Sequence, residues 1–593
     1  MMKKKALYLF LLVITLANCS RKEPENVSFE IDGKWEATWE SLKTRPYPQW
    51  FKDAKLGIFI HWGVYSVPAY GEKESYGEWF LRGLQLKEPF RTNFMKKNYG
   101  ENFTYRDFAP LFKAELFNAD EWAELFEKAG AKYMIFVSKH HDGYAMWPSK
   151  YSPGWNSVEV GPKRDLVGEL EKAIRKTNVK FGLYYSLPEW NNKLHMWDND
   201  PHDQITSYID QYMLPQFHEL ISTYKPEVLF TDGEWFHSAE DWHARELISW
   251  YYNLVGDDAI VNNRWGGGSD IGFLTPEYSA GINVTDRPWA ECRGLGRSFG
   301  LNRNEKLEAY LSPEELIHFF AKAVGNGGGI TLNVGPKADG QIPLLQQERL
   351  MQLGNWLKVN GEAIYGSETY EKTGEERRMS VKRIDKNLDF NWVRNTPAKT
   401  IKEDDFEVVW TGYIKAKYSE KYLFEARADE GCKIWINNKE IGDKGEVELI
   451  AQNKYPIRIE YFEKKNDAHM HLYWSSESQE KEIIPQPNLY SSKSIDAGDG
   501  LLAEYSSMNQ HIAYTCNNNN LYVISLEWPD DTLVLDIPKP ANGIKISMLG
   551  LEKSIPYTYR NNKLYIDVSG ISYNEMPCDY AWVFKISLYP SSP

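Results

Sequence analysis

Between about residues 50 and 360, short apolar runs alternate with stretches whose apolar residues recur at helical spacing. The runs read as strands over residues 56–62, 133–139, 179–186, 227–232, 259–264 and 329–334. Nearly continuous apolar strands that alternate with helices indicate a parallel sheet with helices outside it. About 310 residues of this pattern favour a (β/α) barrel over an open sheet. The predicted fold class is therefore α/β, with a TIM-like barrel over residues 46–362.

Two helices of this region carry boundary signals. Asn118 is a good N-cap for a helix over residues 119–129, and Gly130 ends that helix just before the next strand. Ser312 and Glu315 have the spacing of a capping box, in which each side chain bonds the backbone N–H of the other residue. These signals support helices between the strands.

After residue 366 the pattern changes to alternating β-like segments with turn residues between them and no convincing helix. One block of such segments covers about residues 406–474, and a second runs from about 514 to 588. We expect antiparallel β-sandwich or barrel domains in this part of the chain.

The N-terminus has the pattern of an export signal. Lysines at positions 3–5 precede an apolar run over residues 6–17, which is too short to span a bilayer. The run ends in Leu-Ala-Asn-Cys19, which resembles a bacterial lipobox. Residues 1–18 would then be a signal peptide, Cys19 the acylated N-terminus, and residues 19–45 a tether and lead-in to the barrel. We expect an exported bacterial lipoprotein of the outer membrane that meets the membrane only through its lipid anchor.

Composition excludes some partners. The chain has 593 residues, and its 83 acidic and 69 basic side chains give a net charge of −14. Such a surface repels phosphate backbones, so nucleic acid is not expected as a partner. The 5 cysteines are scattered without Cys-x-x-Cys pairs, which argues against a disulfide framework or a cysteine-rich metal site.

Polar residues end or directly follow several of the apolar strands. His61 lies near the end of the first strand, His140 and His141 directly follow the second, and Asp232 and Arg264 end the fourth and the fifth. In a parallel barrel the carboxyl ends of the strands form the active site, so these residues are candidates for chemistry. A carboxylate at the end of a buried strand is costly to desolvate, which makes Asp232 the strongest of them.

A second carboxylate, Glu277, lies on the loop after the next strand. Two carboxyl groups on neighbouring barrel loops can reach one substrate, which is the arrangement that glycoside hydrolysis requires. Aromatic rings that could stack on sugar faces are also expected near this edge: Trp62, Trp79, Trp147, Tyr184 and Trp235.

Five motifs, in order over roughly 300 residues, carry a family resemblance. They are Gly-Ile-Phe-Ile-His-Trp-Gly at 57–63, Lys-His-His-Asp-Gly at 139–143, Thr-Asp-Gly-Glu-Trp at 231–235, Ser-Phe-Gly at 298–300 and Leu-Asn-Val-Gly-Pro at 332–336. This set resembles the retaining α-L-fucosidases of glycoside hydrolase family 29. The resemblance implies an exo-acting enzyme that releases L-fucose from fucosylated glycans and needs no cofactor or metal.

The resemblance also implies roles for particular residues. Asp232 would be the nucleophile that forms a covalent fucosyl intermediate, and Glu277, in its Thr-x-Glu-Tyr setting, the acid/base. Glu291 is the alternative acid/base, although Ala290 occupies the place where relatives often have Glu. The residues implied in binding fucose are His61, Glu78, Trp79, His140, His141, Tyr184 and Arg264.

The β-rich region resembles two known domains. Residues 576–578, Met-Pro-Cys, and the strand after them resemble the family's C-terminal β-sandwich, while segments at 405–413 and 428–436 resemble a PA14 domain. We therefore expect the sandwich to begin over residues 363–395, to be interrupted by the PA14-like domain over 396–495, and to resume over 496–593. Whether the PA14-like domain binds calcium or glycan is left open.

Two other functions are open on the sequence alone. A metal-dependent hydrolase could use His61, His140, His141 and Asp142 on the same scaffold. Adjacent histidines on a strand point to opposite sides, which argues against their binding one metal as a pair. The protein could also be a non-catalytic surface protein that binds glycans. The glycosidic linkage and the oligomeric state are not given by the sequence.

Overall fold

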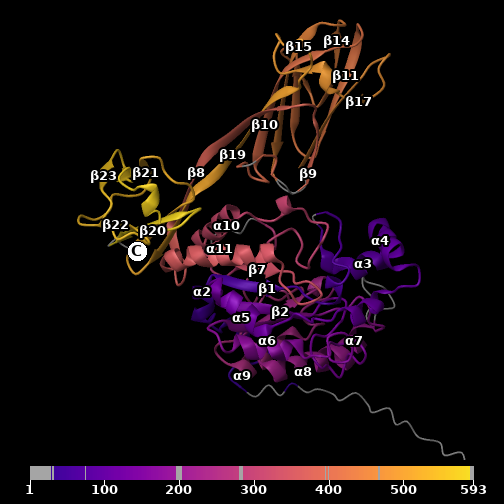
Figure 1. Ribbon diagram of the computed structural model, residues 1–593, viewed down its shortest axis with the longest axis vertical. Coiled ribbons are helices and arrows are strands. Elements are labelled where there is room, and N and C mark those ends of the chain that lie inside the picture. The colour runs from indigo at the N-terminus through magenta and orange to yellow at the C-terminus, as the bar shows by residue number, and fades with distance from the viewer. Residues whose placement is uncertain are drawn as a thin grey trace, which may run out of the picture. The chain divides into compact units, whose positions relative to one another are not determined.

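The computed structural model describes residues 29, 33–73, 75–194, 204–279, 285–393, 396–398, 400–464 and 468–587. The chain divides into two compact units, Met1–Gly366 and Ser367–Pro593, which are described separately (Figure 1). The predicted signal peptide, residues 1–18, and the predicted lipidation site Cys19 lie outside the described residues, as does the first part of the tether.

The first unit contains a curled sheet of seven parallel strands in the order β5-β4-β3-β2-β1-β7-β6. The strands are β1 (Leu56–Ile60), β2 (Tyr133–Lys139), β3 (Lys180–Ser186), β4 (Val228–Asp232), β5 (Ile260–Val261), β6 (Ala290–Gly294) and β7 (Gly329–Val334). Six of them lie within the ranges that the sequence predicts, and β6 was not predicted. The TIM-like α/β architecture is confirmed.

The two edge strands of this sheet, β5 and β6, are linked through residues 273–277. Isolated parallel bridges join Asn262 with Phe273, Leu274 with Trp289, and Glu277 with Cys292. The connection around the barrel is therefore made here by single bridges instead of a regular strand. One of the residues it fixes is the candidate acid/base Glu277.

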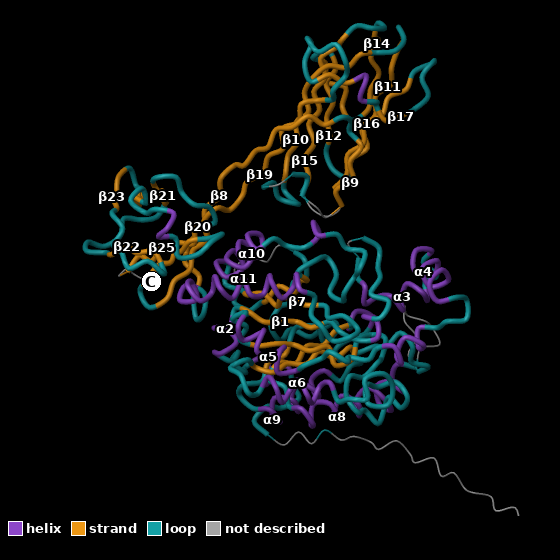
Figure 2. The backbone as a smooth tube through the Cα atoms, in the orientation of Figure 1, coloured by secondary structure: helices purple, strands orange, loops and turns teal. Residues whose placement is uncertain are grey.

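Helices surround the sheet (Figure 2). They are α1 (Trp39–Lys43), α2 (Gln49–Ala54), α3 (Phe80–Gln85), α4 (Pro89–Tyr99), α5 (Ala119–Lys128), α6 (Leu166–Ile174), α7 (Ile205–Tyr208), α8 (Leu214–Tyr224), α9 (Ala244–Val255), α10 (Pro313–Gly325) and α11 (Leu344–Asn360). The expected caps are present: the Asn118 side chain accepts the N–H groups of Asp120 and Glu121, and Ser312 and Glu315 form the capping box of α10. Gly130 has the positive φ, 87°, with which a glycine ends a helix.

The interior of the barrel is apolar below its polar rim. One buried cluster includes Phe59 of β1, Ile135 of β2, Tyr184 of β3, Phe230 of β4 and Phe273. The first four side chains come from successive strands, Phe273 comes from the segment after β5, and all five are at most 2% exposed. Burying large side chains on adjacent strands fixes the strand ends, and therefore the residues that follow them, in space.

The second unit consists of antiparallel strands. They are β8 (Glu368–Asp385), β9 (Asp389–Val393), β10 (Phe406–Lys415), β11 (Glu420–Ala428), β12 (Cys432–Ile436), β13 (Lys439–Gly442), β14 (Lys444–Leu449), β15 (Lys454–Glu463), β16 (Ala468–Ser475), β17 (Glu482–Ile483), β18 (Leu489–Tyr490), β19 (Leu501–Asn517), β20 (Asn520–Ser525), β21 (Thr532–Leu535), β22 (Lys545–Met548), β23 (Tyr557–Arg560), β24 (Lys563–Asp567) and β25 (Trp582–Ser587).

Two long strands, β8 and β19, pair with each other from Leu501 to Cys516 and serve two separate cores (Figure 1). Tyr505 of β19 belongs to a core that also contains Leu388, whereas Tyr514 of the same strand belongs to a core built from residues further along the chain. The first core therefore extends beyond the predicted PA14-like domain, residues 396–495, at both ends. It does so because the single strand β19 contributes residues to both cores.

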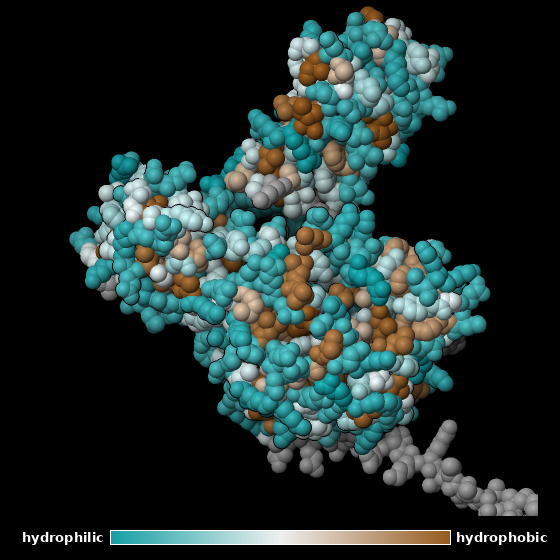
Figure 3. All heavy atoms as spheres, in the orientation of Figure 1, coloured by the Kyte–Doolittle hydropathy of each residue, from teal (hydrophilic) through white to brown (hydrophobic). Residues whose placement is uncertain are grey.

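The described part of the chain contains no helix long and apolar enough to cross a membrane. The face seen in Figure 3 is mostly hydrophilic, with hydrophobic residues in scattered patches.

Candidate active site

A cavity of about 110 Å³ lies at the carboxyl ends of the barrel strands. Its lining brings together residues that are far apart in the sequence: Phe59, His61, Tyr76, Glu78, Trp79, His140, Tyr184, Phe230, Asp232, Trp235, Arg264, Glu277, Cys292 and Phe299. Of the nine residues predicted for catalysis and sugar binding, all but His141 line this cavity, and Nε2 of His141 lies 3.6 Å from Oδ2 of Asp232.

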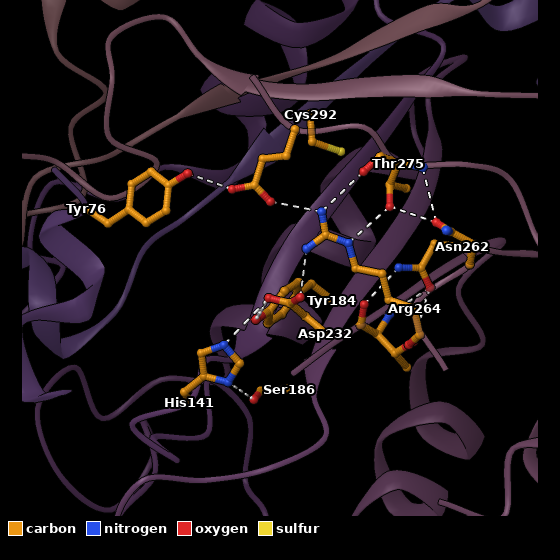
Figure 4. Close-up of polar contacts among 12 residues, drawn as sticks. Tyr76, His141, Tyr184, Ser186, Asp232, Asn262, Arg264, Thr275 and Cys292 are labelled. Atoms are coloured by element: carbon orange, nitrogen blue, oxygen red, sulfur yellow. Dashed lines mark hydrogen bonds and ion pairs between the residues drawn. The ribbon is translucent and has the colours of Figure 1, made fainter. Parts of the chain in front are cut away.

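Asp232, the last residue of β4, is held by three neighbouring side chains (Figure 4). Its Oδ1 accepts a 2.8 Å hydrogen bond from Nη1 of Arg264, and its Oδ2 accepts one of 2.9 Å from the hydroxyl of Tyr184. Nε2 of His141 lies 3.6 Å from the same Oδ2. Burial disfavours the charged carboxylate, but the Arg264 guanidinium and His141 outweigh it and hold the pKa of Asp232 well below its usual range.

Arg264 binds both candidate catalytic carboxylates at once. While Nη1 binds Asp232, Nη2 donates a 2.9 Å hydrogen bond to Oε2 of Glu277. The guanidinium is itself fixed by Thr275, whose hydroxyl oxygen accepts a 3.0 Å bond from Nε (Figure 4). Because a guanidinium is a planar fork of donors, it sets the direction of each carboxylate as well as its distance.

Glu277 reaches the cavity from the segment that links β5 to β6. Its Oε1 accepts a 2.7 Å hydrogen bond from the hydroxyl of Tyr76, a residue that the sequence analysis did not single out. Its side chain is 30% exposed, against 12% for Asp232. Glu277 therefore has more access to water than Asp232 has, although both bind the same arginine.

Glu291, the alternative acid/base, does not line the cavity. It is fully buried in β6, where its Oε1 accepts the backbone N–H of Ser279 at 3.2 Å. Its neighbour Cys292 faces the cavity instead. Successive residues of a strand point to opposite faces, so the two cannot both reach the cavity.

Glu78 is buried against the backbone of the Ser-Phe-Gly motif. It belongs to the short 3-10 helix Gly77–Trp79, and its Oε2 accepts the N–H of Gly300 at 2.7 Å and the hydroxyl of Ser298 at 3.3 Å. Burial raises the pKa of Glu78 to about 8, against the opposing effect of these hydrogen bonds. At neutral pH this cavity residue therefore carries a proton and can donate it in a hydrogen bond.

Two histidines, His61 and His140, line the cavity. Nδ1 of His61 lies 2.7 Å from Oδ1 of Asn333, and burial lowers the pKa of His61 to about 4. Burial, together with the neighbouring His141 and His61, also lowers the pKa of His140 well below its usual range. His61 and His140 are therefore neutral at pH 7, and each imidazole can both donate and accept a hydrogen bond.

The expectation that His140 and His141 point to opposite sides is wrong. Their ring centroids are 4.5 Å apart, and His140 lines the cavity while His141 reaches the nucleophile candidate that also lines it. Strand β2 ends at Lys139, so the two histidines lie beyond the strand and its alternation does not govern them.

Asp142 serves the fold of this loop. Its Oδ2 accepts a 2.7 Å hydrogen bond from Tyr105, and its Oδ1 accepts the N–H of Tyr144 at 3.2 Å. No cluster of three or more His, Cys, Asp or Glu side chains arranged to hold a metal is found among the residues that the structure describes.

Tryptophans form the rim of the cavity. Trp79 stacks on Trp235 with ring centroids 6.1 Å apart, and it meets Trp190 edge to face at 5.2 Å. Trp235 is 47% exposed. Two other predicted sugar-binding rings lie elsewhere: Trp62 and Trp147 are each 1% exposed and are absent from the cavity lining. Their indole N–H groups bind the carbonyl of Lys337 and the carboxylate of Glu219.

Sequence comparisons identify the family of the chain. The family described as "Alpha-L-fucosidase" matches residues 24–362, the PA14 domain matches 364–488, and the "Alpha-L-fucosidase C-terminal domain" matches 506–587. Human plasma alpha-L-fucosidase is 42% identical over 352 residues, which are 58% of this chain and 74% of that protein. The alpha-L-fucosidase of Branchiostoma floridae is 40% identical over 363 residues, 60% of this chain and 80% of that protein.

Solved structures of the same family share the fold. The structure of Thermotoga maritima alpha-fucosidase in complex with a mechanism-based inhibitor has a TM-score of 0.64 and 30% sequence identity, covering 93% of this chain and 99% of that one. The family match covers more than half of the chain, and the shared fold extends into its second unit. The chain belongs to the alpha-L-fucosidase family of glycoside hydrolases and carries a PA14 domain between its barrel and the C-terminal domain of that family.

Proposed function

We propose that this protein is an exo-acting, retaining α-L-fucosidase that releases L-fucose from fucosylated glycans by double displacement. The observation that carries the proposal is the attachment of Asp232 and Glu277 to one arginine at the edge of a small cavity. Retaining glycosidases use two carboxyl groups close together, one as nucleophile and one as acid and then base.

In the first step Asp232 attacks the anomeric carbon of α-linked fucose. Its contacts with Arg264, Tyr184 and His141 keep the carboxylate ionised and aimed into the cavity. As the new bond to Asp232 forms, the bond between the anomeric carbon and the glycosidic oxygen breaks, and Glu277 donates a proton to the departing oxygen. The intermediate is a β-linked fucosyl ester of Asp232.

In the second step Glu277 takes a proton from water, which attacks the same carbon and releases Asp232. Two inversions restore the α configuration in the free fucose. The 30% exposure of Glu277 supports this role, because the acid/base must meet both the leaving group and the incoming water. Full burial of Glu291 against Ser279 argues against the alternative assignment.

The size and the lining of the cavity support a single sugar ring as the bound unit. Pockets for drug-sized ligands have volumes of roughly 300–1,000 Å³, whereas this cavity has about 110 Å³. The neutral imidazoles of His61 and His140 and the protonated Glu78 offer both donors and acceptors to sugar hydroxyls. Trp79 and Trp235 at the rim offer apolar surface to the sugar or to its leaving group.

The proposal is tested with an aryl α-L-fucoside. The parent protein should hydrolyse it, and NMR of the first-formed fucose should show the α anomer. Asp232→Asn should lose nearly all hydrolysis while it stays folded, as a cooperative thermal transition would show. A first-formed β anomer would rule out retention, and near-parental turnover by Asp232→Asn would rule out Asp232 as the nucleophile.

Two results would favour the alternative functions. Binding of fucosides without turnover by the parent would favour a glycan-binding protein, and loss of activity in EDTA would favour a metal-dependent hydrolase.

We also propose that the protein is exported and anchored to the outer membrane by lipid on Cys19, on the sequence pattern of residues 1–19. In a bacterial host, labelled palmitate should be incorporated into the parent and not into Cys19→Ala. The variant should leave the membrane fraction. Equal labelling of both proteins would refute lipidation at this residue.

A further inference from the structure

A buried ion pair lies next to the active site without lining its cavity. Nζ of Lys139, at the end of β2, donates a 2.7 Å hydrogen bond to Oε1 of Glu189, and the two side chains are 0% and 6% exposed. Neither residue is part of the cavity lining. Transferring both charges from water costs several kcal/mol per ion, so their placement here calls for a role beyond stability.

The pair is well satisfied in its surroundings. Nζ of Lys139 also lies 4.0 Å from the ring centroid of Tyr185, and Oε2 of Glu189 accepts a 3.4 Å hydrogen bond from Asn192. Burial lowers the pKa of Lys139, and the charge of Glu189 opposes that shift. A buried pair of this kind fixes geometry, because removing one partner leaves the other as an unpaired buried charge.

The two residues on either side of Glu189 both contact the His141 region. The N–H of Trp190 donates a 2.8 Å hydrogen bond to the carbonyl of His141. The carbonyl of Pro188 accepts a 2.6 Å bond from the hydroxyl of Ser186, and that hydroxyl also bonds Nδ1 of His141 (Figure 4). The loop that carries Glu189 therefore holds the backbone of His141 directly, and it holds the ring through Ser186, the last residue of β3.

Glu189 also packs directly on the His141 loop. Gly143 has a φ of 77°, and a Cβ placed on it would lie 2.7 Å from Oε2 of Glu189. Lys139, the partner of Glu189, precedes His141 by two residues. The ion pair thus joins the start of the His141 loop to the loop after β3, with His141 between them.

The other end of His141 meets Asp232. Because Nδ1 is engaged by Ser186, Nε2 is the ring nitrogen that faces Oδ2 of Asp232, at 3.6 Å. This contact is one of those that lower the pKa of Asp232. In addition, the N–H of Leu187 donates a 2.9 Å hydrogen bond to the carbonyl of Asp232, so the same loop also fixes the backbone of that residue.

We propose that Lys139 and Glu189 are positioning residues for the nucleophile. Their ion pair locks the loop over residues 187–190 onto the end of β2, and the loop holds the backbone of His141 directly and its imidazole through Ser186, which keeps the ring against Asp232. Neither residue touches the sugar. The inference rests on the proposed role of Asp232 and adds two residues that act on it through His141.

The test removes both charges together, in the double variant Lys139→Met with Glu189→Gln, which avoids leaving either charge buried alone. We expect a folded protein whose kcat on an aryl α-L-fucoside falls about 10- to 100-fold, as for a misplacement of roughly 1 Å in a reacting group. KM should change little. The acidic limb of kcat/KM should move to higher pH, because Asp232 loses part of its contact with His141. In a crystal structure of the variant the His141 ring should have moved away from Asp232.

A matched control is the ion pair of Arg175 and Glu227 at the other end of the barrel strands. Nη1 of Arg175 lies 3.0 Å from Oε1 of Glu227, which directly precedes β4. The double variant Arg175→Met with Glu227→Gln should lose stability and keep the parent's kcat and pH profile.

Parental kcat and an unmoved acidic limb in the Lys139/Glu189 variant would overturn the inference, and so would a crystal structure with His141 still 3.6 Å from Asp232. Should the double variant not fold, Glu189→Asp, which shortens the link but keeps the charge, is measured in the same way, with the same outcomes deciding. A parent without fucosidase activity would refute the proposed function, and the position of His141 in the variant crystal would still decide the inference.

Discussion

Asp232 and Glu277 are bound by the two terminal nitrogens of one guanidinium, with Nη1 and Nη2 of Arg264 at 2.8 and 2.9 Å from the two carboxylates. This cation lets two acidic groups lie close together without the repulsion that would otherwise raise the pKa of one of them. It also separates their environments, because Asp232 is further engaged by Tyr184 and His141 while Glu277 is held by Tyr76 and water can reach it.

Replacing Arg264 should affect Asp232 most. In Arg264→Met the carboxylate loses the cation that opposes its burial, so the pKa of Asp232 should rise. We expect the acidic limb of kcat/KM to move to higher pH and kcat to fall by about 100-fold or more. Arg264→Lys keeps the charge but cannot bind both carboxylates as a fork, so it should keep more of the low-pH activity than Arg264→Met but not the parental kcat. Identical pH profiles for the parent and Arg264→Met would contradict this explanation.

The dependence of the hydrolysis rate on the leaving group distinguishes the two acid/base candidates, Glu277 and Glu291. Glu277→Gln should slow the hydrolysis of fucosides with poor leaving groups by about 10²- to 10⁴-fold, and much less that of a dinitrophenyl fucoside, whose departure needs no proton. Glu291→Gln should lower the melting temperature, because Glu291 is fully buried, and leave the dependence on leaving group as in the parent. The reverse pattern would make Glu291 the acid/base.

Tyr76 should affect catalysis by holding the carboxylate of Glu277 in place. Its hydroxyl supplies one of the two hydrogen bonds that hold the Glu277 carboxylate. Tyr76→Phe should therefore reduce kcat for poor leaving groups by about 10-fold, the cost of one hydrogen bond to a charged group, with little change in KM. Tyr65→Phe is a control of the same kind, since Tyr65 is a buried tyrosine near the site that does not line the cavity. An equal effect of both variants on kcat would argue for general disruption of the site.

The raised pKa of Glu78 should make the stability of the protein depend on pH. Its pKa in the folded protein is about 8, against an ordinary value of 4.5, so the folded state holds its proton more tightly than the unfolded state does. This contribution to stability is complete below about pH 4.5 and is lost as the pH rises through about 8. Glu78→Gln keeps the shape without titrating, so its melting temperature should fall less than the parent's between pH 6 and pH 9. A parallel fall in both proteins would refute the shift.

Much of the barrel can be predicted because its strands are apolar and buried on both faces. Strand β6 escaped prediction because its sequence, Ala-Glu-Cys-Arg-Gly, contains two charged residues. The segment over residues 273–277 escaped because it is joined to its neighbours by single bridges and has no strand pattern. Both lie where the barrel connects β5 to β6, so the local pattern is weakest beside the acid/base.

The residues of the candidate site also fall into those that the sequence could predict and those that it could not. Residues that end or directly follow apolar strands, such as Asp232, could be recognised from position alone. Tyr76 could not, because it lies 201 residues from Glu277 in the sequence and neither ends nor directly follows a strand. The prediction for Trp62 and Trp147 failed because an aromatic residue near a strand end can pack between helices and sheet as readily as in a cavity, and only the packing decides which.

The central claim is that Asp232 bonds covalently to fucose during turnover. A 2-deoxy-2-fluoro-fucosyl fluoride should inactivate the parent protein, because its C2 fluorine slows both steps while its good leaving group speeds the first, so that the intermediate accumulates. Mass spectrometry of the digested protein should then find one fluorofucosyl group on the peptide that contains Asp232, and fragmentation should assign it to that side chain. A label on any other residue, or inactivation without a label, would contradict the account.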